Sequence, residues 1–171
     1  MKQSPRTKSP KMVAAGKKAA VTRKRRRAVK KAGRTARWAT IMTKWLVTRT
    51  NARPKWQLVD FAGPGGRESA GIVDVLAIRK DHSPPPAGLK RGDLFQTVLF
   101  QIKGGSALWP TVDDIDRLRR VARYHRATRV VLAEWKKGKQ PTFFRLKKVS
   151  TPNSGRRASW IEITDVDELF A

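Results

Sequence analysis

The pattern of apolar positions predicts a first helix that begins near residue 38. Five apolar residues follow the i, i+3, i+4, i+7, i+8 spacing of an amphipathic helix: Trp38, Ile41, Met42, Trp45 and Leu46. The segment at residues 51–54, which contains Pro54, ends this helix. We expect the apolar stripe to pack into a core and not to bind a ligand.

The next segments alternate between strand and turn patterns. Residues 56–61 predict a strand, residues 63–66 a glycine-rich turn, and residues 71–78 a strand that is buried on both faces. Residues 81–93 form a loop, because three consecutive prolines fit neither a helix interior nor a central strand. A second buried strand follows at residues 94–103.

A second helix and further strands complete the pattern. Thr111 and Asp114 form a capping box that opens the helix. Its expected inner face consists of Val112, Ile115, Leu118, Val121, Ala122 and His125. Strands are expected at residues 129–135, 142–147 and 159–164. The order of helix, three strands, helix and further strands predicts an α/β fold with a mixed central sheet flanked by helices.

Polar residues interrupt two of the buried strands. Asp74 lies in the middle of an apolar run, where an unpaired carboxylate costs several kcal/mol, so it needs a strong partner or a cation. Gln101 and Lys103 share one face at the end of the next buried strand, because side chains alternate with a period of two. The sequence therefore predicts a polar pair that converges at this strand end.

Charge divides the chain into two parts. The 171 residues contain 39 Lys and Arg against 13 Asp and Glu, a formal net charge of +26, and the first acidic residue is Asp60. We expect residues 1–36 to form a disordered arm rich in Lys, Arg and Ala, and residues 37–171 to form the α/β domain. The large positive charge predicts a polyanionic partner, with nucleic acid the leading candidate.

Two groups of cations are candidates for phosphate contact. In the arm they are Arg23, Lys24, Arg25, Arg26, Arg27, Lys30 and Lys31, and on the outer face of the second helix they are Arg117, Arg119, Arg120, Arg123 and Arg126. The arm resembles linker-histone tails in composition. A localisation signal, an arm for ribosomal RNA or a solvated tail are alternatives for the arm, and a solvated face is the alternative for the helix.

Composition excludes several classes of function. The chain has no cysteine and 2 histidines, which excludes disulfides, thiolate zinc sites and a cysteine nucleophile. No apolar run is long enough to cross a membrane, and no signal peptide or Walker-type phosphate loop is evident. We expect a cytoplasmic, nucleoid-associated protein, or a nuclear one if the host is a eukaryote, with no membrane partner.

The arrangement of Asp74, Gln101 and Lys103 resembles the PD-(D/E)XK nuclease superfamily, which includes Holliday-junction resolvases and restriction enzymes. An aspartate in one apolar strand, a loop, a strand that ends in a polar-x-Lys pair and a following helix carry the resemblance, over residues 38–147. It implies a restriction-endonuclease-like fold and a Mg²⁺- or Mn²⁺-dependent endonuclease that hydrolyses phosphodiester bonds in DNA, with branched or repair intermediates among the substrates. DNA is favoured over RNA, and a homodimer is implied for an enzyme that cuts two strands.

The resemblance assigns roles to individual residues. Asp74 matches the metal-binding aspartate, Lys103 the catalytic lysine, and Gln101 the position that usually holds Glu or Asp, while Glu68 could supply the additional acid of some members. The carbonyl of Ile102 would complete a metal shell made with Asp74 and Gln101. An amide at Gln101 removes one negative charge from that site.

Other interpretations remain for the same residues. Asp74 could pair with a helix arginine, Gln101 could satisfy backbone groups at a sheet edge, and Lys103 could reach solvent from a strand end. The protein would then be an inactive nuclease-fold protein that binds DNA, or a basic nucleoid or ribosomal-RNA-binding protein.

Overall fold

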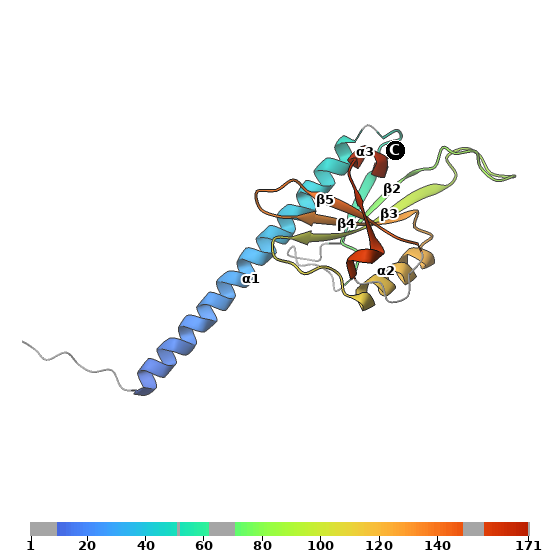
Figure 1. The fold of residues 1–171 in the computed structure, drawn as a ribbon. Coiled ribbons are helices and arrows are strands. Elements are labelled where there is room, and N and C mark those ends of the chain that lie inside the picture. Colours follow the sequence, from blue (N-terminus) through green and yellow to red (C-terminus); the bar gives the residue numbers. More distant parts are fainter. Residues whose placement is uncertain (1–9, 51, 62–70, 149–155, 171) are drawn as a thin grey trace, which may run out of the picture. The chain divides into compact units, whose positions relative to one another are not determined.

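The computed structural model describes residues 10–50, 52–61, 71–148 and 156–170 (Figure 1). The chain divides into two units, Met1–Arg34 and Thr35–Ala171. One helix, α1 (Pro10–Arg49), runs from the first unit into the second. The boundary between the units lies close to the expected boundary at residue 36.

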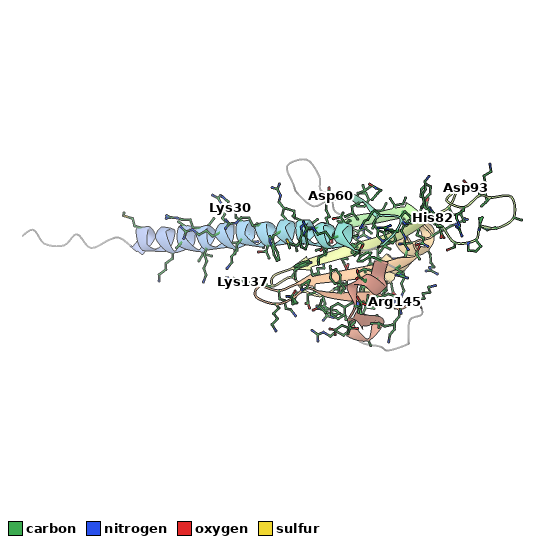
Figure 2. The ribbon with its side chains drawn as sticks, turned by 90° about the horizontal axis from the view of Figure 1, so that it is seen from above. Lys30, Asp60, His82, Asp93, Lys137 and Arg145 are labelled. Carbon is green, nitrogen blue, oxygen red and sulfur yellow. The ribbon has the colours of Figure 1, made fainter. Side chains whose placement is uncertain are left out.

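Residues 10–36 are helical, which corrects the expectation of a disordered arm. They form the first part of α1, and the lysine and arginine side chains from residue 17 to residue 34 are exposed, as Figure 2 illustrates for Lys30. Repulsion between like charges favoured an extended chain, but Ala, Lys and Arg are among the strongest helix formers. In a helix these long side chains also radiate away from one another into solvent.

The second unit contains a mixed sheet of six strands in the order β1-β2-β3-β4-β5-β6. The strands are β1 (Gln57–Asp60), β2 (Val75–Lys80), β3 (Phe95–Gly104), β4 (Arg129–Trp135), β5 (Thr142–Leu146) and β6 (Trp160–Ile163). Only β3 and β4 pair in parallel within this sheet, and α2 (Val112–Tyr124) connects them. A short 3-10 helix, η2 (Arg156–Ser159), precedes β6, and α3 (Val166–Phe170) follows it. The predicted α/β class, mixed sheet and order of elements are confirmed.

Each face of the sheet has its own apolar core. Ala39 and Val47 of α1 pack with Phe100 on one face, together with Phe170 of α3. Ile115 and Leu118 of α2 pack with Leu99 and Leu132 on the other face. Residues that alternate along β3 and β4 therefore point toward α1 and α2 in turn.

The last residues of α3 are held by distant parts of the chain. The Trp56 indole N–H and an Arg79 guanidinium N–H both donate to the Phe170 carbonyl, at 3.3 and 2.9 Å. Arg129 donates to the Leu169 carbonyl at 2.5 Å, and the Phe170 ring stacks on Phe100 with 5.9 Å between ring centroids. Burial, followed by the neighbouring charge of Arg129, lowers the pKa of Arg79.

The apolar stripe at the end of α1 lies on the wrong side of the helix for the predicted core role. Trp38, Ile41 and Trp45 are 47, 52 and 43% exposed, whereas Met42 and Leu46 are half-buried against the core. The buried side of the helix instead presents the smaller residues Ala39, Thr43 and Val47. Small residues let the helix approach the sheet closely: a Cβ added at Gly104 would lie 2.9 Å from the Thr35 carbonyl oxygen.

Helix α2 begins as predicted. Thr111 is its N-cap, and the reciprocal hydrogen bonds of the capping box with Asp114 are both present. Ile115 and Leu118 are buried and Val121 and Ala122 are half-buried, but Val112 and His125 are exposed, so they do not belong to the inner face. His125 is the C-cap, one residue beyond the end of the helix at Tyr124.

The loop between β2 and β3 carries the triple-proline segment, with His82 and Asp93 near each other on it (Figure 2). His82 is exposed, as expected. Within the described parts of the chain, no helix combines the length and apolar character that crossing a bilayer requires.

Candidate active site

Asp74 lies immediately before β2, which begins at Val75 and not at residue 71, so the predicted mid-strand position of Asp74 is wrong. Its amide N–H donates to the Phe100 carbonyl at 2.8 Å, and its own carbonyl accepts from the Phe61 N–H at 3.2 Å. Its carboxylate oxygen Oδ2 accepts from the Ile102 amide N–H at 2.5 Å. The aspartate is therefore fixed between the end of β1 and the middle of β3.

Gln101 lies between two residues of β3 that bind Asp74. The Asp74 N–H donates to the carbonyl of Phe100, and the Asp74 carboxylate accepts from the N–H of Ile102. The paired register of β2 with β3 ends at Val75 and Phe100, so Asp74 lies just beyond it. Gln101 is 5% exposed, and none of the described residues donates a hydrogen bond to its Oε1 atom. A buried amide oxygen without a donor carries a desolvation penalty of about 1–3 kcal/mol, which a bound cation or water would relieve.

Lys103 and Glu134 continue the same face. Lys103 is two residues beyond Gln101 on β3, and the parallel register pairs it with Glu134 of β4. Gln101, Lys103 and Glu134 share the parity of the strand residues that pack against α2, such as Leu99 and Leu132. The predicted common face of Gln101 and Lys103 is present, and Glu134 is a further member.

Glu134 is held in place by two neighbours. The indole N–H of Trp109 donates to Glu134 Oε1 at 2.8 Å, and Lys136 forms a salt bridge with Oε2 at 3.0 Å. The Glu134 side chain is 12% exposed. Trp109 itself packs on Phe144, with 4.7 Å between centroids, and beneath the guanidinium of Arg157. Sequence reasoning missed Glu134; pairing the predicted strand at residues 129–135 with residues 94–103 in parallel could have found it.

The N-terminus of α2 adds another carboxylate near Lys103. Hydrogen bonds from the Thr111 backbone N–H and then from its hydroxyl lower the pKa of Asp114, and the positive charges of Lys103 and Arg117 act in the same direction. The end of β3, the end of β4 and the start of α2 thus form a cluster of alternating charge around Lys103.

One residue of the predicted site lies outside the residues that the structure describes. Glu68 falls in residues 62–70, outside the described residues. Among the residues that the structure does describe, no three histidines, aspartates or glutamates gather as a metal-binding group. The Ile102 carbonyl was the third predicted metal ligand. The contact between Ile102 and Asp74 in the structure is a hydrogen bond from the Ile102 amide N–H to the Asp74 carboxylate.

The arginines of α2 divide between solvent and the fold. Arg117, Arg120 and Arg123 are exposed, as expected for an outer face. Arg126 is also exposed, but it lies beyond the end of α2 at Tyr124 and has a positive φ of 49°, which corrects its assignment to the helix.

Arg119 differs from the prediction: its side chain is 13% exposed, pairs with Asp116 at 3.1 Å and donates to the Lys147 carbonyl at 3.5 Å. It follows the buried Ile115 by four residues, so it lies on nearly the same side of the helix and joins α2 to the segment after β5.

A basic groove lies between α2 and the adjacent ends of β4 and β5, with a volume of about 1480 Å³. Its cationic lining residues are Arg119, Arg120, Arg123, Arg126, Arg129, Arg145, Lys147 and Lys148. Asp113 and Asp116 are the two acidic residues in the lining. The strand cations were not among the sequence candidates, because nothing in a linear pattern places Arg145 beside α2; Figure 2 labels Arg145 on its strand.

The cations of the first unit are arrayed along α1. Arg23, Lys24, Arg25, Arg26, Arg27, Lys30 and Lys31 are all exposed on this helix. Five consecutive residues cover all sides of a helix with 3.6 residues per turn, so this segment carries positive charge around its whole circumference.

No family model, no curated protein and no solved structure matches this chain. The assignment of a chemistry to the site therefore depends on the geometry, burial and charge of its own residues.

Proposed function

We propose that this protein is a metal-dependent nuclease that hydrolyses phosphodiester bonds in DNA, with a restriction-endonuclease-like core. The observation that carries the proposal is the buried amide oxygen of Gln101, to which none of the described residues donates. Gln101 lies between the two β3 residues that bind Asp74, and it shares the α2 face of the sheet with Lys103. The order α1, β1, β2, β3, α2, β4 supports the proposal. It matches the order of elements on which the resemblance to the PD-(D/E)XK nuclease superfamily depends.

The residues present fit a hard divalent cation. The Asp74 carboxylate, which is bound by the N–H of Ile102, and the Oε1 atom of the adjacent Gln101 would be the protein ligands. Two protein oxygens are enough for Mg²⁺, which keeps several waters. When bound, such an ion supplies charge stabilisation for a phosphoryl oxygen and lowers the pKa of a bound water. The Oε1 atom of Gln101 supports this fit to a cation, because it is a buried acceptor for which the described residues provide no donor.

The chain's own groups have separable roles. Lys103 supplies an ammonium group beside Asp74 and Gln101, where it can donate to a phosphate oxygen and offset the charge that develops on phosphorus. The Ile102 amide holds the Asp74 carboxylate in one orientation. Glu134, which the strand register places beside Lys103, is bound by Trp109 and Lys136.

The exposed cations supply binding. The groove beside α2 and the exposed basic face of α1 attract the phosphate backbone without regard to sequence, and the affinity falls as salt rises. Binding alone does not identify a nuclease. Cleavage that needs both a metal ion and Lys103 does.

We expect Lys103→Ala to lose cleavage by about 10²-fold or more, since it removes the only side-chain cation assigned to the scissile phosphate. The assay uses supercoiled plasmid, linear duplex and a four-way junction, each with Mg²⁺, Mn²⁺ or EDTA. Lys80→Ala, which removes an exposed lysine from the far end of β2, is the matched control. Equal cleavage by both variants, or cleavage that persists in EDTA, would overturn the assignment.

Gln101→Glu tests the metal ligands by gain of function. A carboxylate at this position restores the missing charge, so we expect half-maximal cleavage at about tenfold lower Mg²⁺ concentration. In EDTA the same variant should unfold at a lower temperature than the wild type, because two carboxylates then lie side by side. Differential scanning fluorimetry with and without Mg²⁺ checks this; a variant that is insensitive to the metal would contradict the ligand assignment.

A second candidate function is DNA binding without cleavage. The amide at Gln101 favours it, because it leaves Asp74 as the one carboxylate among the described residues assigned to the metal. This alternative predicts binding to all three DNAs and no cleavage with any metal ion.

A further inference from the structure

The outer face of α1 carries a half-exposed aromatic stripe that contacts the core through Trp38, whose ring meets that of Trp135. Trp38, Ile41 and Trp45 are between 43 and 52% exposed, and their i, i+3, i+7 spacing places them along one side of the helix. The opposite side of the same turns, with Ala39 and Val47, is buried. We call these three exposed residues the α1 stripe.

The α1 stripe lies in a strongly basic stretch. Residues 35–59 contain five Lys or Arg and no acid. The guanidinium of Arg49 lies 4.1 Å from the centroid of the Trp45 ring, and Arg37 is exposed one residue before Trp38. Two copies of such a surface would repel each other. A ligand with flat apolar rings and a negative backbone complements it, and that description fits unpaired nucleotides.

The α1 stripe begins at the end of the sheet that holds the candidate active site. The Trp38 ring meets the ring of Trp135 edge-on, with 5.2 Å between centroids, and Trp135 directly follows Glu134 on β4. Thr35, three residues before Trp38, lies against Gly104, which directly follows Lys103. Lys44, next to Trp45, pairs with Asp60 at the end of β1, and Phe61 is hydrogen-bonded to Asp74.

We propose that the α1 stripe binds single-stranded DNA, with unpaired bases stacked on Trp38 and Trp45 and the flanking phosphates held by Arg37 and Arg49. This inference deepens the proposed function and rests on it, because it specifies the substrate as DNA that has an unpaired segment next to the cleaved position. A base has an aromatic face whatever its sequence, so the stripe selects for strandedness and not for sequence.

The test measures binding in EDTA, so that it does not depend on cleavage. Fluorescence anisotropy compares a labelled 30-nucleotide single strand with a blunt duplex of the same length, using the full chain, Trp45→Ala and Trp38→Ala/Trp45→Ala. The double variant should bind the single strand at least about tenfold more weakly and the duplex within about twofold of the wild type. Trp38→Phe/Trp45→Phe should restore most of the single-strand affinity, because phenylalanine can still stack.

Two controls separate this effect from misfolding. Leu108→Ala removes another apolar side chain, 81% exposed, and should change neither affinity. Trp45→Ala alone leaves the Trp38–Trp135 contact intact, so it keeps the test valid if the double variant loses stability.

Each outcome of these measurements supports or overturns the binding of single-stranded DNA by the α1 stripe. An equal loss for both DNAs, or no loss for either, would overturn the proposal. A mass of two chains in light scattering that the double variant abolishes would also overturn it, since the stripe would then be a dimer interface. Loss of single-strand binding with no cleavage by the wild type would support the stripe while removing the nuclease.

Discussion

Asp74→Asn should lose metal-dependent DNA cleavage by about 10³-fold, because it neutralises the one described carboxylate assigned to the metal. Asparagine has the same shape, and its side-chain oxygen can still accept from the Ile102 N–H, so the local fold should persist. Binding to DNA in EDTA should change by less than about twofold, since binding is carried by surface cations. Initial rates of plasmid nicking across a Mg²⁺ series measure the loss.

The control for this variant is Glu162→Gln, which removes an exposed carboxylate from β6 and lies outside the groove lining. It should cleave at the wild-type rate. If Asp74→Asn keeps its activity, or if both variants lose it, the metal-ligand role of Asp74 is refuted. If Asp74→Asn is inactive and also unfolds at a much lower temperature, the aspartate is structural, and the Lys103→Ala result then decides.

Removal of residues 1–34 should weaken DNA binding by about 10⁵-fold at 0.05 M salt and should flatten its salt dependence. The removed segment carries 14 Lys or Arg and no acid. If about half of these cations contact phosphates, the slope of log K against log salt becomes shallower by about 6. Filter binding of a duplex between 0.05 and 0.3 M salt provides the slope.

A charge variant keeps the helix and removes part of the charge. Replacement of residues 23–27 by five glutamines preserves helix propensity, because Gln and Lys are similar helix formers. The slope of log K against log salt should become shallower by up to about 4. An unchanged slope in both proteins would mean that α1 does not touch DNA, and the groove beside α2 would then carry the affinity.

The order of elements could be predicted from the sequence because each element has a clear local signal. The capping box of Thr111 and Asp114 fixes the start of α2, and residues 129–135 were predicted with the observed bounds. The wrong prediction that Trp38 and Trp45 pack into the core has a different cause. Trp38 and Trp45 follow a helical period, but a period says only that residues share a face and not that this face is the buried one.

The candidate site was predictable where it depended on strand parity, and not where it depended on strand pairing. Gln101 and Lys103 are two residues apart, so their common face follows from the sequence. Glu134 and the groove cation Arg145 enter through the parallel pairing of β3 with β4 and the packing of α2, which link residues far apart in the chain. The helix over residues 10–36 was not predicted, because repulsion between like charges favours an extended chain. The helix propensity of Ala, Lys and Arg outweighs this repulsion.

The attachment of α3 has a consequence for the order of folding events. The hydrogen bond from Trp56 to the Phe170 carbonyl joins residues 114 positions apart, and the Phe170 ring fills the same core as α1. Contacts of such long range form late and slow the search for the native state. Until α3 has been synthesised and has docked, the chain can pair β1 to β4 but cannot complete the α1-side core. Completion of this core, together with the hydrogen bonds that fix Arg79 and Trp56, is therefore expected as a late step of folding.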